Sequence, residues 1–229
     1  LFRSIARTIR EKSPDCLFHV DGVQGYGRIP VDVKQWDIDT FALSGHKFGA
    51  PKGVGALYIR KGVRVLPLIY GGGQERGLRA GTENFPYIGA MGLAAKLSFT
   101  DREAKNRHLE EVKQALLAAL TAAGVDFEIN GDPERTASHI LNLRFPGVKS
   151  EVLLHYLEGR GIYVSQGSAC HSHSKSGSET LTAMGLSADD RDASLRFSFG
   201  DETKKEEMAE VAAAVKSGSA MIRTMRGKK

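Results

Sequence analysis

The stretch Ser44-Gly45-His46-Lys47 places a lysine between a predicted strand and a glycine-rich turn. An apolar run at 38–43 precedes it, and the glycines and proline of 49–55 lead into a second strand-like run at 54–59. Strand ends are where an α/β sheet places its ligand sites. The pattern therefore predicts an α/β sheet with an amine at a strand end, within reach of a ligand.

A carboxylate ends another apolar run upstream, at Asp21. A lysine in a turn is more often a solvated charge, and this aspartate is what argues against that interpretation of Lys47. Together the two residues suggest a Schiff-base site for pyridoxal 5'-phosphate, in which the aspartate pairs with the pyridine nitrogen of the cofactor.

The order of four motifs makes a family resemblance specific. The motifs are His19-Val20-Asp21-Gly22-Val23-Gln24, Ser44-Gly45-His46-Lys47, the glycine-rich stretch from Gly71 to Thr82, and Ser165-Gln166-Gly167-Ser168-Ala169-Cys170. With them the chain resembles the pyridoxal-phosphate-dependent cysteine desulfurases, class V aminotransferase-like proteins whose catalytic cysteine sits in a Ser-Gly-Ser-Ala-Cys loop. Family members are considerably longer, and the resemblance is to their carboxyl-terminal portion, lacking the amino-terminal part.

The resemblance implies the type I fold of pyridoxal-phosphate-dependent transferases, an aspartate-aminotransferase-like α/β fold. Residues 1–100 would form the carboxyl-terminal part of the large cofactor-binding domain, with a mainly parallel sheet. Residues 101–229 would form a smaller α+β domain that carries the cysteine loop. We place this boundary near Thr100, where Thr100-Asp101-Arg102-Glu103 fits a capping box that would begin a new helix.

Local patterns predict the individual elements. The spacing of apolar residues predicts a helix over 1–12, and strand-like runs occupy 16–21, 38–43 and 54–59. Cys16 opens the first of these runs and is expected to be a small core residue. In the second part, strands are expected at 125–129, 138–145 and 161–165, and helices at 150–159 and 202–223.

The resemblance also assigns roles around the cofactor. Lys47 would hold the cofactor and later move protons, and Asp21 would pair with its pyridine nitrogen. Gln24 would donate its amide to the phenolic oxygen, while Ser44 and His46 would hydrogen-bond the phosphate.

Three further residues complete the expected site. Thr82 would reach the phosphate bound in the neighbouring subunit, which implies a homodimer with shared active sites. Cys170 would be the second catalytic residue, whose thiolate attacks the sulfur of the substrate. Arg196, on an alternating strand pattern, would bind the substrate carboxylate through its guanidinium.

The reaction implied is the conversion of L-cysteine to L-alanine with a persulfide left on Cys170. Its sulfur would pass to an acceptor, such as an iron–sulfur scaffold protein or an enzyme that thiolates tRNA or a cofactor. Three alternatives stay open. One is a selenocysteine lyase or a related enzyme of the same fold. The others are an inactive fragment that needs its missing amino-terminal half, and a metal-binding module built on Cys170, His171 and His173, whose close spacing disfavours it.

The composition limits the class of protein and the partners to be expected. The chain has 229 residues, of which 41% are hydrophobic, and no apolar run approaches the length that spans a bilayer. Two cysteines argue against a disulfide framework, and the net charge of +5 is modest and spread along the chain. We therefore expect a soluble cytoplasmic protein with no membrane partner, no direct nucleic-acid partner and no bound metal.

Overall fold

The computed structural model describes residues 2–166 and 178–226. The chain divides into two compact parts, unit 1 (Leu1–Arg102) and unit 2 (Glu103–Lys229). The assignment of residues 1–100 to a large domain and of residues 101–229 to a small domain remains a prediction.

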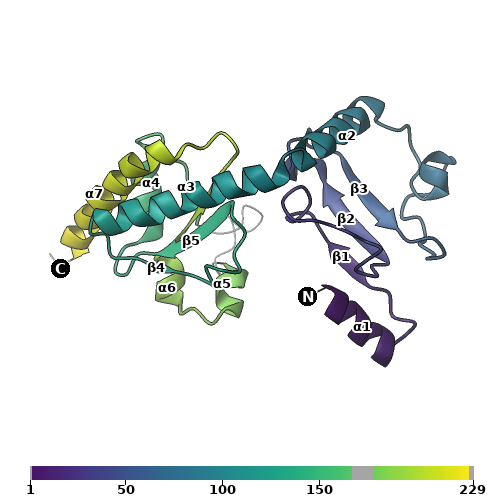
Figure 1. Ribbon diagram of the computed structural model, residues 1–229, viewed down its shortest axis with the longest axis horizontal. Helices are drawn as coiled ribbons and strands as arrows, with labels where there is room; N and C mark the ends of the chain where they lie inside the picture. Colours follow the sequence, from purple (N-terminus) through teal and green to yellow (C-terminus); the bar gives the residue numbers. More distant parts are fainter. Residues whose placement is uncertain (1, 167–177, 227–229) are drawn as a thin grey trace. The chain divides into compact units, whose positions relative to one another are not determined.

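Unit 1 contains a three-stranded sheet with the order β1-β2-β3. Its elements in chain order (Figure 1) are α1 (Phe2–Lys12), β1 (His19–Asp21), β2 (Thr40–Ser44), the 3-10 helix η1 (Gly45–Lys47), β3 (Gly55–Ile59), the 3-10 turn η2 (Gln74–Gly77) and α2 (Phe85–Phe99). Strand β1 runs parallel to β2, and β3 runs antiparallel to β2. The predicted strands at 38–43 and 54–59 are thus confirmed, with small shifts at their ends.

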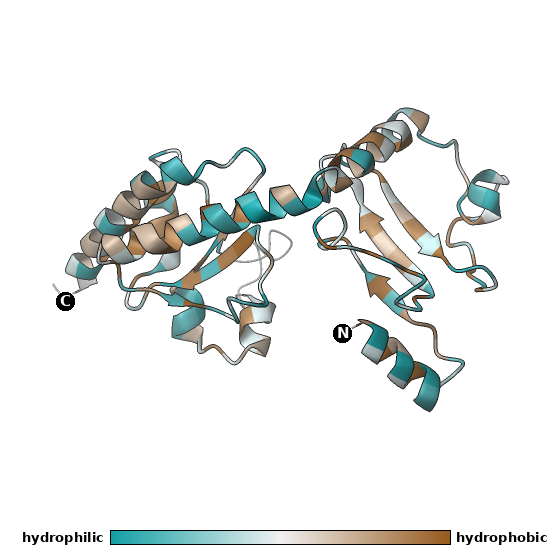
Figure 2. Cartoon of the chain, in the orientation of Figure 1, coloured by the Kyte–Doolittle hydropathy of each residue, from teal (hydrophilic) through white to brown (hydrophobic). Residues whose placement is uncertain are grey.

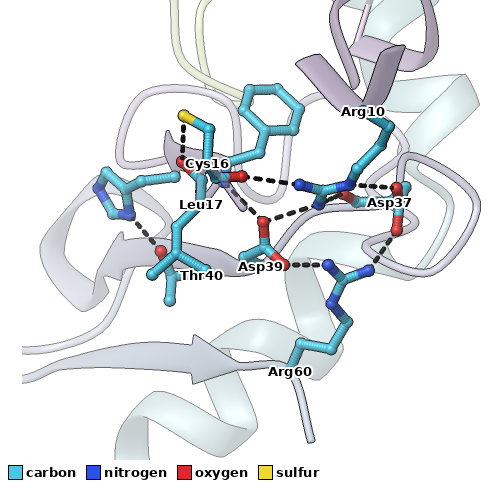
Figure 3. A network of polar contacts seen from close by, with 9 residues as sticks. Arg10, Cys16, Leu17, Asp37, Asp39, Thr40 and Arg60 are labelled. Carbon is cyan, nitrogen blue, oxygen red and sulfur yellow. Dashed lines mark hydrogen bonds and ion pairs between the residues drawn. The ribbon is translucent and has the colours of Figure 1, made fainter. Parts of the chain in front are cut away.

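An ionic network fixes the start of the parallel pair (Figure 3). Asp39, whose side chain is 1% exposed, directly precedes β2 and accepts a hydrogen bond of 2.6 Å from the backbone N–H of Phe18, directly before β1. Arg10 of α1 and Arg60, which follows β3, both pair with Asp39 and with Asp37. The network therefore joins α1 and all three strands at one end of the sheet.

The apolar core of unit 1 is small. Its buried members are Ala6, Phe18, Val20, Ile38 and Phe41. Trp36 packs at the margin of this cluster, where its ring stacks on Phe2 with a centroid distance of 4.8 Å. Helix α1 supplies one face of the cluster and the sheet supplies the other.

Unit 2 contains a second three-stranded sheet, which is antiparallel throughout and has the order β4-β5-β6. Its elements (Figure 1) are α3 (Arg102–Ala122, beginning at the boundary), β4 (Glu128–Ile129), β5 (Ile140–Arg144), α4 (Ser150–Glu158), α5 (Glu179–Ala183), α6 (Ala188–Asp192), β6 (Ser194–Ser198), η4 (Lys205–Glu207) and α7 (Met208–Arg226). One large cluster of buried residues draws on α3, β5, α4, β6 and α7. The predicted helices at 150–159 and 202–223 are confirmed in α4 and in η4 with α7.

Three local predictions are wrong. Cys16 is exposed and precedes β1, because the chain turns after α1 and enters the sheet only at His19. The capping box at Thr100 does not form: the Thr100 hydroxyl donates to the carbonyl of Lys96 at 3.0 Å, and so closes the end of α2. In place of the expected strand at 161–165, Ser165 alone forms a β-bridge.

Across residues 2–166 and 178–226, none of the helices combines the length and the apolar composition needed to cross a membrane.

Candidate active site

The parallel pairing of β1 and β2 brings the two predicted cofactor-binding segments to one edge of the sheet. His19 lies opposite Thr40 and Asp21 opposite Ala42, so both strands run toward the same edge. Asp21 is the last residue of β1, and Ser44 ends β2 directly before η1, which carries Lys47. The segments that carry the carboxylate and the amine therefore follow neighbouring strands at the same edge of the sheet.

A glycine fixes the chain just after Asp21. A Cβ atom at Gly22 would lie 1.8 Å from Cζ of Phe41, so a side chain cannot be accommodated without displacing that ring. The Gly22 N–H donates to the carbonyl of Ala42 at 2.9 Å, and the Val23 N–H donates to Oδ1 of Asp21 at 3.0 Å. These contacts hold an exposed carboxylate in a defined position at the edge of the sheet.

The turn that carries Lys47 is held by backbone hydrogen bonds. The Gly45 N–H donates to the carbonyl of Val54 at 2.9 Å, and the Ala50 N–H donates to the Gly45 carbonyl at 3.0 Å. Lys47 is half-buried, and His46 beside it is exposed. Oγ of Ser44 and Nδ1 of His46 lie 2.9 Å apart, so this pair presents hydrogen-bonding groups next to the lysine.

Gln24 and Thr82 are both exposed in unit 1. Gln24 lies in the turn that follows β1, close in sequence to Asp21. Thr82 follows a turn that an isolated parallel β-bridge between Ile69 and Arg79 closes. Within this turn, Oε1 of Gln74 accepts a hydrogen bond of 3.2 Å from the Gly81 N–H.

Arg196 lies on β6 in unit 2 and carries an unusual polar atom. Its Nε is buried and has no hydrogen-bond partner within the described part of the chain. Buried polar groups in proteins are nearly always paired, and a cationic nitrogen without a partner is especially costly. The side chain is therefore suited to receive an anionic group.

Arg196 also anchors the segment that leads to the predicted catalytic cysteine. Its N–H donates to the carbonyl of Ser165 at 2.7 Å, and the Ser165 N–H donates back to the Arg196 carbonyl at 3.1 Å. Nε2 of Gln166 donates to Oγ of the buried Ser150 at 2.7 Å. Cys170 itself lies outside the described residues.

The metal-binding alternative rests on residues in the same stretch. His171 and His173, like Cys170, lie outside the described residues. Elsewhere, residues 2–166 and 178–226 contain no group of three or more side chains placed to hold a metal ion.

Two contacts at or near the site were not found from the sequence. Nδ1 of His19 lies 2.8 Å from Oγ1 of Thr40, across the parallel pair, on the same strand face as Asp21. The strand alternation that puts residues 19 and 21 on one face is readable from the sequence, but the partner strand is not. Likewise, the side-chain bond between Gln166 and Ser150 depends on how α4 packs, and no sequence signal indicates it.

Comparison with known proteins identifies the family. The family model of aminotransferase class V matches residues 2–211. Cysteine desulfurase IscS of Methanosarcina thermophila is 41% identical over 214 residues, which cover 93% of this chain and 53% of that protein. Cysteine desulfurase 2 of Trichormus variabilis is 43% identical over 206 residues, covering 89% of this chain and 51% of the relative.

Solved structures agree with the sequence comparison. A NifS-like protein superimposes with a TM-score of 0.86 at 32% identity, over 96% of this chain and 57% of the other. DndA from Streptomyces lividans gives a TM-score of 0.68 at 36% identity, over 86% and 55% of the two chains. The chain thus spans about half the length of the relatives that it matches. It belongs to the aminotransferase class-V family, and its fold is that of the type I pyridoxal-phosphate-dependent transferases.

Proposed function

We propose that this chain carries the cofactor-binding lysine and the sulfur-accepting cysteine of a cysteine desulfurase. The reaction converts L-cysteine and the thiol of Cys170 to L-alanine and a persulfide on Cys170. The cysteine desulfurase names of the matched relatives support this proposal. The observation that carries it is the parallel pairing of β1 and β2, which brings Asp21 and Lys47 to one sheet edge.

The residues at this edge fit pyridoxal 5'-phosphate, the cofactor of the family. The cofactor has a basic ring nitrogen, an aldehyde, a phenolic oxygen and a phosphate. Asp21 offers the ring nitrogen a carboxylate, Lys47 offers the aldehyde an amine, and the paired side chains of Ser44 and His46 offer the phosphate hydrogen bonds. Gln24 supplies an amide for the phenolic oxygen. When bound, the cofactor acts as an electron sink for the substrate carbanion.

The chain's own residues would manage the substrate and the sulfur. Arg196 would bind the carboxylate of L-cysteine, and its unpartnered Nε supports that role. Lys47 would carry protons to and from the substrate carbon once its amine is released. Cys170 would attack the substrate sulfur as a thiolate, so that the carbon–sulfur bond breaks and the sulfur leaves on the protein.

The same proposal includes partners and a location. Thr82 would contribute to the phosphate site of a second subunit, so the working enzyme would be a homodimer. The persulfide would be passed to an acceptor protein that serves iron–sulfur assembly or thiolation. We place the protein in the cytoplasm, and the exposed free thiol of Cys16 is in keeping with a reducing compartment.

Cofactor binding is tested by the visible absorption spectrum of the chain with added pyridoxal phosphate. We expect a band that Lys47→Ala removes and that Lys52→Ala leaves in place. Lys52 is the matched control, because it is an exposed lysine in the same glycine-rich turn. A band equally strong in both variants would refute the assignment of Lys47.

Sulfur transfer is tested with the only two cysteines of the chain. After incubation with L-cysteine and pyridoxal phosphate, we expect mass spectrometry to find one added sulfur on Cys170 and one alanine released per persulfide. Cys170→Ser should abolish the added sulfur, whereas Cys16→Ser should leave it unchanged. Alanine without any persulfide on Cys170 would contradict the proposed role of that residue.

A further inference from the structure

The sheet of unit 2 has one apolar face and one polar face. Leu141 and Leu143 of β5 and Leu195 of β6 are buried in the core of the unit. Polar residues interrupt the apolar run of β5, which is drawn in brown broken by teal in Figure 2. Because side chains alternate between the two faces of a strand, Asn142 and Arg196 lie on the face opposite the core.

Asn142 is the cross-strand neighbour of Arg196. The backbone N–H and C=O of Arg196 bond to Ser165 on the other side of β6. The pairing of Asn142 with Arg196 is therefore of the non-hydrogen-bonded type, in which the side chains of opposite residues lie closest. This places the amide of Asn142 beside the guanidinium to which the proposed function assigns the substrate carboxylate.

A chain of hydrogen bonds fixes the orientation of the Asn142 amide. Oγ of the buried Ser194 donates its single proton to the backbone carbonyl of Asp190 at 2.6 Å, so toward other groups it can only accept. Nδ2 of Asn130 donates to that oxygen at 2.8 Å and to Oδ1 of Asn142 at 2.7 Å. Turning either amide would bring two acceptors or two donors together. Nδ2 of Asn142 is therefore held on the branch of its amide that is turned away from Asn130.

Two neighbouring donors are thus left for a ligand. Nε of Arg196 is buried and has no acceptor in the described part of the chain, and neither has Nδ2 of Asn142. Arg144, the other arginine on this face of β5 and β6, already pairs with Glu128 and Asp190. The charge available to a ligand is that of Arg196 alone. Two donors and one positive charge match a carboxylate, which has two acceptor oxygens and one negative charge.

We infer that Asn142 is a further substrate-binding residue, whose Nδ2 donates a hydrogen bond to the carboxylate that Arg196 binds. Asn130 and Ser194 are positioning residues, because they hold the Asn142 amide in the orientation that this bond requires. The inference rests on the proposed function, which supplies L-cysteine as the ligand. It makes Asn142 a determinant of specificity, since a substrate without a free carboxylate would leave both donors unpaired.

An NMR titration of the isotope-labelled chain tests the inference without cofactor or turnover. The ligand is L-alanine, the amino-acid product of the proposed reaction, which has the same carboxylate and amine as L-cysteine. The matched control ligand is L-alaninamide, which lacks the carboxylate. We expect L-alanine, and not L-alaninamide, to shift the side-chain N–H signals of Asn142 and Arg196. These signals are identified by their loss in Asn142→Ala and Arg196→Lys.

Two variants separate binding from orientation. Asn142→Ala should weaken the binding of L-alanine about tenfold, because a hydrogen bond to a charged group is lost. Asn130→Asp keeps the size of the side chain but cannot donate, so the Asn142 amide should turn its nitrogen toward the new carboxylate. We expect this variant to bind L-alanine as weakly as Asn142→Ala does, while the Asn142 signal stays visible and no longer responds to the ligand. Gln114→Ala removes an exposed amide from α3 and is the control, which should keep its affinity.

Each outcome bears on the inference. Weaker binding in both variants, with unchanged binding in the control, supports it. A shift of the Arg196 signal alone, with equal affinity in Asn142→Ala, overturns it and leaves the role of Arg196 intact. Equal shifts with L-alaninamide also overturn it, since the site would then not recognise the carboxylate. If L-alanine shifts neither signal, the inference fails together with the role of Arg196, while the absorption band that depends on Lys47 still tests the rest of the proposed function.

Discussion

Units 1 and 2 are similar in size but differ in how they bury apolar residues. In unit 2, a sheet and the helices α3, α4 and α7 enclose one large core, in which Leu143 and Leu195 are fully buried. In unit 1, the core is a small cluster, and Leu68 is left 93% exposed. Unit 1 instead holds its strands with the ionic network of Arg10, Asp37, Asp39 and Arg60. The difference teaches that apolar burial is the main source of stability in unit 2, whereas unit 1 relies more on its ionic network.

The two units can be followed separately because the single tryptophan, Trp36, lies in unit 1. Its fluorescence reports the unfolding of unit 1, while circular dichroism is weighted toward the long helices α3 and α7 of unit 2. Urea unfolding recorded by both signals therefore measures the two stabilities side by side.

The largest effect is expected in the core of unit 2. Leu143→Ala removes a fully buried side chain from β5 and should cost about 4 kcal/mol, because a cavity is left in a closely packed core. We expect the circular dichroism midpoint to fall and the Trp36 transition to stay in place. Leu57→Ala, at a position 49% exposed in unit 1, is the control and should change little. A fall in both transitions after Leu143→Ala would show that the units unfold as one.

The next effect should appear only in unit 1. Asp39→Ala leaves Arg10 and Arg60 without their shared buried partner and should cost about 3 kcal/mol. This estimate takes the lower end of the range for broken buried ion pairs, because both arginines remain partly exposed. The Trp36 midpoint should fall, while Asp15→Ala, an exposed aspartate of the same unit, should leave it unchanged. An unmoved Trp36 midpoint after Asp39→Ala would mean that the network does not hold unit 1 together.

A smaller effect is expected at the proposed cofactor edge. Gly22→Ala forces a Cβ into the ring of Phe41 and should destabilise unit 1 by about 2 kcal/mol through overpacking. Gly89→Ala is the matched control: its Cβ would meet no atom within 4 Å, and it lies inside α2. That change should stabilise the helix by up to about 1 kcal/mol. Equal Trp36 midpoints for the two variants would contradict the close approach of Gly22 to Phe41.

Strongly patterned elements could be predicted from the sequence. Apolar runs bounded by glycine turns located β2 and β3, and helical spacing located α1, α4 and α7. Helix α2 has no polar face, so it gives no 3.6-residue pattern to find. Helices α5 and α6 have five residues each, too few for a periodic signal.

The candidate site was predictable as residue types and not as geometry. Asp21 and Lys47 were identified by their places after apolar runs, but their proximity depends on the parallel pairing of β1 with β2. That pairing is stabilised by Asp39, whose arginine partners lie 29 and 21 residues away in the sequence. Long-range ion pairs of this kind have no local signature, so the element that orders the site was not foreseen.

Acidification should give the smallest effect and should separate the two units again. Burial alone would raise the pKa of Asp39, but hydrogen bonds from the Phe18 N–H, Arg10 and Arg60 outweigh it and lower the pKa. Hydrogen bonding from Arg10 likewise lowers the pKa of Asp37. A lowered folded-state pKa stabilises the protein above the unfolded value of about 3.9, and this stability is lost as the pH falls through the folded-state pKa.

Between pH 7 and pH 3, the free energy of unfolding of unit 1 should therefore fall by less than the Asp39→Ala substitution lowers it. Protonation neutralises Asp39 but keeps its side chain in place. In unit 2, hydrogen bonds from Ser187 and Arg144 also lower the pKa of Asp190, but solvent screens this more exposed pair, and its loss matters less. Urea midpoints at several pH values would measure both trends, and Asp39→Asn should flatten the one reported by Trp36. If the two midpoints fell in parallel and Asp39→Asn changed neither slope, the network would not be what distinguishes unit 1 from unit 2.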